Sequence, residues 1–155
     1  MTESKVKFSE PLRVFVYGTL KPGEANYQRY CADKVVKVKR AVTLGKLFAL
    51  PMGYPAMTLG QDQVHGYLFC FSDPEVLSAL DYLEDYQPTR PMLENLYNRQ
   101  QVKVYDLQGQ SLGWAWAYFM TLELVGKFKG ILQADGWWSG CGLTAKERYE
   151  FEKLP

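Results

Sequence analysis

The run Val14–Tyr17 is the feature that most constrains how this chain folds. In an extended conformation, its residues Val-Phe-Val-Tyr place apolar or aromatic side chains on both faces of the strand. A strand of this kind is covered on both faces, so the chain must place a layer on each side of it. The run stops at Gly18, and a polar turn containing Lys21-Pro22-Gly23 follows. We therefore expect a doubly buried strand that ends in an exposed loop.

Further apolar and β-branched stretches predict more strands and few helices. The predicted strands are residues 40–50, 63–71, 99–107 and 111–119, the last two joined by a hairpin at 108–110. The predicted helices are 26–34, a helix reaching about Asp85 behind a capping box of Ser72 and Glu75, and a terminal helix capped by Thr144 with Glu147. Because the strands do not alternate regularly with helices, we expect an α+β fold, a curled mixed sheet or small barrel with helices outside.

The second hairpin strand carries bulky and small side chains on opposite faces. Trp114, Trp116 and Tyr118 share one face, while Ala115 and Ala117 share the other. We expect the small face to lie close against another layer of the fold.

Composition narrows the class of protein. The 155 residues are enough for one domain, and 18 basic against 17 acidic residues leave no field that would steer nucleic acid or an anionic membrane. No apolar run reaches the roughly 18 residues that a spanning helix needs, and the polar start is not a secretory signal. Three scattered cysteines and a single histidine, His65, favour a reducing compartment without a metal site. We expect a cytoplasmic protein.

Glu84 is a carboxylate in an unexpected place. The apolar face of the predicted helix is formed by Val76, Leu77, Leu80 and Leu83. At about 100° per residue, Glu84 falls on this same face. One interpretation is that Glu84 reaches outward or pairs with Arg90 or Arg99. The other is a desolvated carboxylate with a raised pKa, suited to act as a base.

The turn after the first strand is a second candidate. Gly18 can adopt backbone angles closed to other residues, and successive N–H groups there can form a nest for a carboxylate or an oxyanion. The alternative is an ordinary turn. Tyr97 can present its hydroxyl to the same site or simply be a half-buried tyrosine.

These features occur together in one order along the chain. The stretches are VFVYGTLKPG from Val14, YP from Tyr54, VHGYLF from Val64, LDYLEDY from Leu80 and YNRQQVKV from Tyr97. In this order they resemble the gamma-glutamylcyclotransferase-like family, which includes the gamma-glutamylamine cyclotransferases. The resemblance covers about residues 13–120, which leaves 1–12 as a lead-in and 121–155 as a C-terminal segment packed on the same domain.

The resemblance implies a fold, a reaction and a site. The fold would be a small mixed β-barrel flanked by helices. The reaction would be attack of a γ-glutamyl α-amine on its own γ-carbonyl, which releases 5-oxoproline and an amine or amino acid from a small γ-glutamyl substrate. Such a ring closure supplies its own nucleophile, so no cofactor and no metal is implied. The implied residues are Glu84 as catalytic acid and base, with Tyr17, Gly18, Thr19, Leu20, Tyr97 and Tyr118 binding the substrate.

Two positions depart from the family pattern. Tyr67 stands where members often have an acidic residue, and Asp85 follows Glu84 where members often have glycine. We expect the second charge of Asp85 either to raise the pKa of Glu84 further or to alter substrate preference.

Two rival functions remain at this stage. One is a non-catalytic module that binds a small carboxylate or amine in the same cavity. The other is an assembly protein that uses the WAWAYF stretch and the Trp137-Trp138 pair as an adhesive surface. The sequence specifies neither the leaving group nor the oligomeric state.

Overall fold

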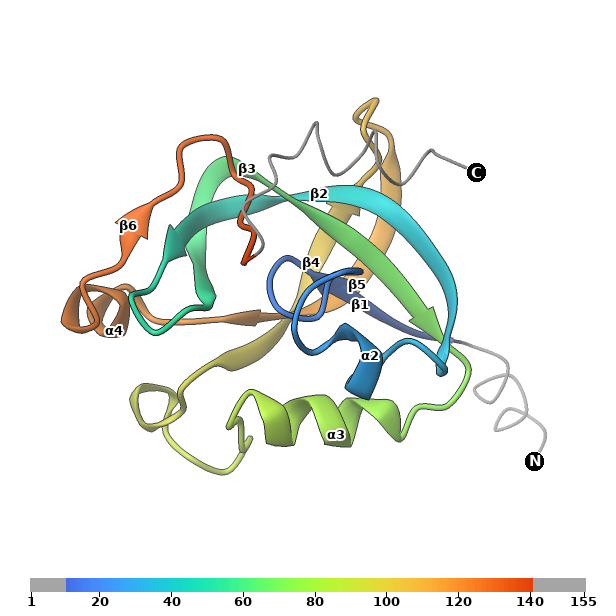
Figure 1. Cartoon of the computed structure of the whole chain (residues 1–155), viewed down its shortest axis with the longest axis horizontal. Coiled ribbons are helices and arrows are strands. Elements are labelled where there is room, and N and C mark those ends of the chain that lie inside the picture. Colours follow the sequence, from blue (N-terminus) through green and yellow to red (C-terminus); the bar gives the residue numbers. More distant parts are fainter. Residues whose placement is uncertain (1–10, 141–155) are drawn as a thin grey trace.

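Strands that curl into a closed ring dominate the computed structural model, which describes residues 11–140 (Figure 1). The strands are β1 (Leu12–Val16), β2 (Val35–Ala49), β3 (Pro55–Phe71), β4 (Asn98–Tyr105), β5 (Ser111–Phe119) and the short β6 (Ile131–Leu132). Their order is β3-β1-β5-β4-β2-β6, and β2 also pairs with β3, which closes the ring. The β1–β5 pair is parallel and the other pairs are antiparallel. The fold is α+β with a small mixed barrel-like sheet, as predicted.

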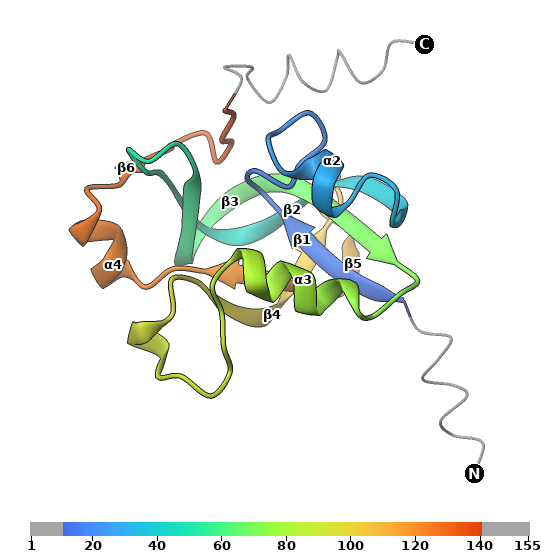
Figure 2. The same cartoon turned by 60° about the horizontal axis from the view of Figure 1, so that its bottom comes forward.

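The helices lie outside this ring. They are α2 (Tyr27–Tyr30), α3 (Val76–Leu83), the 3₁₀ turn η1 (Met92–Glu94) and α4 (Leu122–Lys127). Helix α3 runs along the outside of the sheet (Figure 2), with Val76 and Leu80 buried against it. The predicted terminal helix lies outside the described residues.

The predicted capping box at the start of α3 is wrong. Glu75 occupies the cap position without a side-chain hydrogen bond, and Ser72 does not cap the helix. Instead a carboxylate oxygen of Asp73 accepts a hydrogen bond from the Glu75 amide at 2.9 Å. An aspartate that bonds the amide two residues ahead forms a turn of its own, which delays the start of the helix.

Strand β1 is buried on both faces, as its sequence predicts. Phe15 belongs to a core cluster that draws residues from β1, β2, β3, β4 and β5, and so fills the interior of the ring. Val14 and Val16 belong to a second cluster, which packs the outside of the sheet against α3. All three side chains are at most 4% exposed. The doubly buried strand therefore joins the two cores.

The hairpin of β4 and β5 follows the prediction closely. Its strands pair from Asn98 opposite Phe119 to Tyr105 opposite Ser111. Ala115 and Ala117, on the small face of β5, are fully buried inside the ring. The small side chains of Ala115 and Ala117 let β5 pack closely against the hydrophobic core inside the ring.

Strands β2 and β3 are longer than predicted, because they pair with each other from Val35–Phe71 to Ala49–Pro55 across an irregularity at Gly45/Lys46. Residues 59–62 of β3 lie outside the predicted strands; Gln61 and Asp62 are polar and exposed, so their sequence resembles a loop although they are strand. Among the described residues, none of the helices has the length and apolarity needed to cross a membrane.

Candidate functional site

A cavity of about 310 Å³ opens beside β1, between the Gly18 turn and the end of α3. Its size is typical of sites for small ligands. The described residues that line it are Phe15, Val16, Tyr17, Gly18, Thr19, Leu20, Asn26, Tyr54, Pro55, Leu83, Glu84, Leu96, Tyr97 and Tyr118. The predicted site residues therefore all reach one cavity. Glu84 is the only charged side chain in this described lining.

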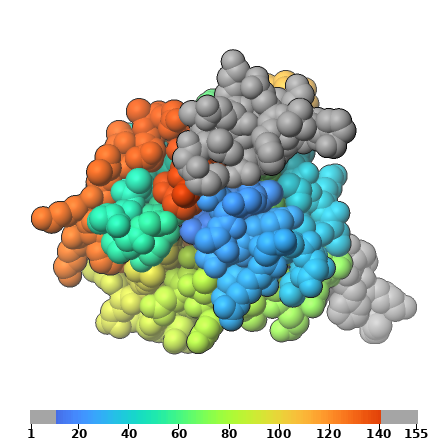
Figure 3. Space-filling view, viewed as in Figure 1, coloured from blue at the N-terminus to red at the C-terminus, as the bar shows by residue number. Residues whose placement is uncertain are grey.

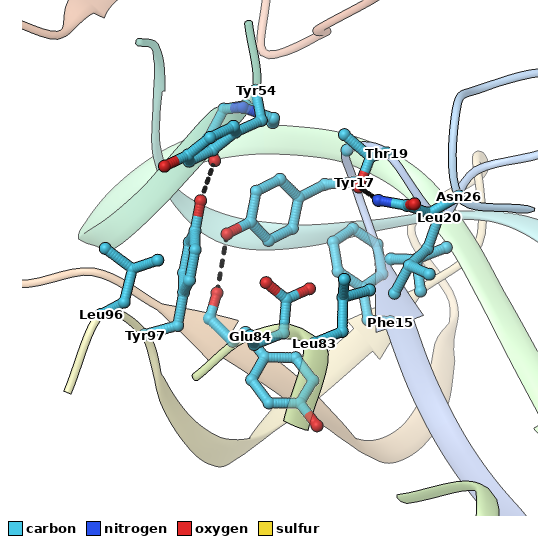
Figure 4. Close-up of a pocket in the computed structure, with 14 residues that line it drawn as sticks. Phe15, Tyr17, Thr19, Leu20, Asn26, Tyr54, Leu83, Glu84, Leu96 and Tyr97 are labelled. Carbon is cyan, nitrogen blue, oxygen red and sulfur yellow. Dashed lines mark hydrogen bonds between the residues drawn. The ribbon is translucent and has the colours of Figure 1, made fainter. Parts of the chain in front are cut away.

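Glu84 is fixed at the C-cap of α3. Its amide donates a hydrogen bond to the carbonyl of Leu80 at 2.9 Å, so the last helical turn holds the backbone. Its carboxylate points into the space between Leu83 and the ring of Tyr17 (Figure 4). The helix thus presents a carboxylate to the cavity from its apolar side.

The arginines proposed as partners of Glu84 are engaged elsewhere. Arg90 pairs with Asp85 at 3.1 Å, and Arg99 Nε lies 2.9 Å from a carboxylate oxygen of Asp81. Glu84 forms no ion pair within residues 11–140. The interpretation of Glu84 as half of a structural ion pair is therefore wrong.

Burial gives the carboxyl of Glu84 a pKa of about 7, well above its ordinary 4.5. The cause is loss of solvation, which penalises the charged form. The expectation that Asp85 would raise this pKa further is not met. Asp85 turns away in a left-handed backbone conformation (φ 54°), and its side chain is 60% exposed and paired with Arg90.

Gly18 is required for a reason other than the one the sequence suggested. It does not adopt a positive φ. A Cβ placed on it would instead lie 2.7 Å from Cγ of Pro55, which is too close for any side chain. The N–H groups of Gly18, Thr19 and Leu20 do not donate in the turn and loop hydrogen bonds of the described chain. The turn therefore brings three amides next to the cavity.

The tyrosines of the cavity are held by their hydroxyls. Tyr17 donates to the carbonyl of Tyr118 at 2.7 Å and accepts from the amide of Met57 at 3.1 Å. Tyr97, one residue before β4, donates to the carbonyl of Pro55 at 2.6 Å (Figure 4). Both rings are thereby fixed against the wall, and their hydroxyl protons are committed to the protein.

These hydroxyls also stay protonated near neutral pH. Burial raises the pKa of Tyr17, Tyr97 and Tyr118, and the Glu84 charge raises each further. Tyr118 directs its hydroxyl to Asp81, with an O–O distance of 2.6 Å. The surroundings of Glu84 are therefore neutral and largely aromatic.

Sequence reasoning missed part of the lining. Asn26, Leu83 and Leu96 line the cavity without having been singled out as binding residues. Tyr54 and Pro55 carried part of the family resemblance but no assigned role. Tyr54 ends the loop that joins β2 to β3 and Pro55 begins β3, and only the folded ring places Pro55 against Gly18.

The loop between α3 and β4, residues 84–97, has its own support. Buried Asn95 accepts hydrogen bonds from the amide of Gln87 at 3.0 Å and from Nε of Arg90 at 2.8 Å. Its amide nitrogen donates to the carbonyl of Gln87 at 3.2 Å and to Oδ1 of Asn98 at 3.0 Å. The cavity wall at Leu96 and Tyr97 is thus held by bonds within the loop itself.

The tryptophans are mostly part of the interior. Trp137 and Trp138 are 4% and 7% exposed, and Trp116 packs on the guanidinium of Arg99 at 4.4 Å. Trp114 alone of these four is exposed. The Trp137-Trp138 pair is therefore not available as an adhesive surface.

The sequence of this chain matches a known protein family and is similar to a known protein. The family model described as "Gamma-glutamyl cyclotransferase, AIG2-like" matches residues 14–140. A gamma-L-glutamyl-butirosin B gamma-glutamyl cyclotransferase from Niallia circulans is 33% identical over 121 residues, which cover 72% of this chain and 74% of that protein.

Solved structures share the fold. An AIG2-like protein from Mus musculus matches with a TM-score of 0.63 and 22% identity, covering 84% of this chain and 89% of that one. YkqA from Bacillus subtilis matches with a TM-score of 0.60 and 24% identity over 83% of this chain, which spans only 39% of YkqA.

Proposed function

Because the chain belongs to the gamma-glutamyl cyclotransferase, AIG2-like family and is an enzyme of that type, we propose that it releases 5-oxoproline from a small γ-glutamyl substrate. The α-amine forms a bond to the γ-carbon of its own chain, and the bond from that carbon to the leaving nitrogen breaks. The observation that carries the proposal is the partly buried and desolvated carboxylate of Glu84, which has no ion-pair partner within residues 11–140 and shares a cavity with the Gly18 turn.

Glu84 acts as the base and then as the acid. An α-ammonium has a pKa of about 8, so an ordinary glutamate would take its proton at a cost of about 5 kcal/mol. With a pKa of about 7, Glu84 lowers this cost to about 1.4 kcal/mol. The proton then passes to the leaving nitrogen. Proton transfer of this kind contributes about 10²–10⁴-fold to the rate.

The turn at Gly18 receives the negative charge of the substrate. The amides of Gly18, Thr19 and Leu20 can donate to its α-carboxylate or to the oxyanion that forms at the γ-carbon. The fixed rings of Tyr17 and Tyr97 hold the substrate curled, which brings amine and carbonyl together. Ring closure in a well-oriented substrate reaches effective molarities on the order of 10⁵–10⁸ M.

The cavity favours a leaving group without a carboxylate. Its described lining offers no cation, and its one charge, Glu84, is negative. An unpaired neutral polar group moved into such a site costs about 1–3 kcal/mol, and an unpaired carboxylate costs more. The Niallia circulans relative is named for gamma-L-glutamyl-butirosin B, so its leaving group is butirosin B. We therefore propose that γ-glutamyl amines are better substrates than γ-glutamyl amino acids.

We also propose that the enzyme is cytoplasmic. Cys31 and Cys70 are buried free thiols, which are stable in a reducing compartment.

The reaction is tested with Glu84→Gln, which keeps the shape of the side chain and removes the base. Purified protein is incubated with γ-glutamyl compounds, and 5-oxoproline is measured by mass spectrometry. We expect release to fall by about 10²–10⁴-fold while binding of 5-oxoproline is retained. Glu75→Gln, an exposed change at the other end of α3, is the matched control and should keep full activity. Parental turnover by Glu84→Gln would refute the assignment.

The leaving group is tested with a matched pair of substrates. γ-Glutamyl-propylamine and γ-glutamyl-2-aminobutyrate differ only in a carboxylate on the leaving group. We expect kcat/KM to be higher for the amine by at least about 5–150-fold, the ratio equivalent to 1–3 kcal/mol. An equal or reversed ratio would contradict the proposed preference and leave the role of Glu84 standing.

A further inference from the structure

Lys21 is a lysine buried inside the protein, immediately after the turn that we propose as the substrate site. Its exposed fraction is 1%, whereas lysines are almost never fully buried unless they are paired. Its ammonium donates to the carbonyl of Trp138 and lies 3.2 Å from the centre of the Trp137 ring. An ammonium over an indole face is attracted by the negative face of the ring.

A second attachment lies three residues further on. The carboxylate of Glu24 accepts hydrogen bonds from the hydroxyl of Ser139 at 3.2 Å and from the amide of Gly140 at 3.0 Å. Lys21 and Glu24 therefore both bind residues 137–140, and we call this arrangement the clasp. Figure 3 shows the two segments in contact, red against blue.

The clasp is anchored on the barrel itself. Trp137 is 4% exposed and belongs to the core outside the sheet, where its ring packs edge-on against Tyr67 with centroids 6.5 Å apart. The backbone beside it is also fixed, because the carbonyl of Gly136 accepts from the amide of His65 on β3 at 2.8 Å. Residues 137–140 thus connect Lys21 to the rigid sheet.

From Lys21 the constraint reaches the cavity through the backbone. The amide of Lys21 donates to the carbonyl of Gly18 at 3.0 Å, which closes the turn. Asn26 donates from its amide to the carbonyl of Thr19 at 2.8 Å and from its side chain to the Thr19 hydroxyl at 3.0 Å. These bonds engage the carbonyls of Gly18 and Thr19, and they use none of the amides of Gly18, Thr19 and Leu20, three residues that line the cavity. Lys21 itself is not among the described residues that line the cavity.

We propose that Lys21 is a positioning residue, whose buried ammonium, held by Trp137 and Trp138, sets the Gly18–Leu20 amides in the geometry that binds the anionic group of the substrate. This proposal rests on the proposed function of the cavity. Because Glu84 is on a different element, loss of the clasp weakens substrate binding and leaves proton transfer intact.

The test is Lys21→Met, which keeps an unbranched apolar stem and removes the charge and the donor. We expect KM for a γ-glutamyl amine to rise about 10–100-fold, the order of loss that a misplaced binding group causes, with kcat changed less than about 3-fold. The pH midpoint of kcat should stay at the parental value, since the surroundings of Glu84 are unchanged. Lys34→Met, at a half-exposed lysine, is the matched control and should leave KM unchanged.

Several outcomes would overturn the inference. A folded Lys21→Met variant with parental KM, or one that loses kcat and shifts its pH midpoint, shows that Lys21 does not act through the turn. If Lys21→Met does not fold, Ser139→Ala removes a single bond of Glu24 and should still raise KM about 2–10-fold. A parental KM in Ser139→Ala would then refute the clasp. An inactive parental protein would instead refute the proposed function.

Discussion

Replacing Glu84 by glutamine should stabilise the protein, and the gain should grow with pH. In the parental protein, burial raises the pKa of Glu84 from 4.5 to about 7. Between these values the folded protein keeps a proton that the unfolded chain has lost. The free energy of unfolding therefore falls as pH rises through this window, because the burial penalty appears only when the carboxyl ionises. Glutamine carries no such penalty.

The size of the effect follows from the same two pKa values. Integration of the proton difference gives a cost for Glu84 of about 0.8 kcal/mol at pH 5 and about 3.4 kcal/mol at pH 8.5. Water that enters the cavity reduces both values. We therefore expect the advantage of Glu84→Gln over the parent to increase by up to about 2.5 kcal/mol between pH 5 and pH 8.5.

Urea denaturation at the two pH values measures this difference. The parent, Glu84→Gln and the exposed-site control Glu75→Gln are unfolded side by side, and the linear extrapolation gives each free energy of unfolding. The control should differ from the parent by similar amounts at pH 5 and pH 8.5. A Glu84→Gln advantage that is constant with pH, or that shrinks as pH rises, would refute the claim that this carboxylate is held at a cost in the folded state.

Further predictions concern the cavity. The kcat/KM of the parent should rise about tenfold per pH unit below a midpoint near 7, since Glu84 must be ionised to act as base, and a midpoint near 4.5 would contradict its burial. Gly18→Ala should lower the free energy of unfolding in urea by about 1–3 kcal/mol and raise KM, because its Cβ would lie 2.7 Å from the Pro55 ring. A variant with parental stability and KM would show that Gly18 and Pro55 are not in close contact. Tyr97→Phe leaves the buried Pro55 carbonyl without its donor and should cost about 1–3 kcal/mol in the same assay, whereas Tyr82→Phe, at an 86% exposed tyrosine, should cost little.

Local patterns were sufficient to predict β1, the β4–β5 hairpin and the direction of Glu84. The doubly apolar run Val14–Tyr17 specifies a strand between two layers, and helical periodicity alone places Glu84 among leucines. Both depend on residues close in sequence. The catalytic and binding roles of the seven residues inferred from the family resemblance stay predictions, although all seven line one cavity.

Features that depend on distant contacts could not be predicted. The burial of Lys21 requires Trp137 and Trp138, more than a hundred residues away in the chain. The influence expected of Asp85 failed because a left-handed residue turns its side chain away from the cavity, which sequence adjacency to Glu84 does not reveal. Residues 59–62 fell outside the predicted strands, because β3 is extended there by its pairing with β2 on either side of an irregularity, at Thr58 and at Asp62, rather than by a local strand pattern.

The loop that follows Glu84 has a consequence for how such enzymes diversify. Asn95 ties this loop to itself, and Met92 and Leu93 of the same loop are exposed. The loop also carries Leu96 and Tyr97, which line the cavity, whereas Glu84 is held by the last turn of α3. Substitutions in this loop can therefore change the cavity wall, and with it the amine that is accepted, while the proton-transfer chemistry is inherited unchanged.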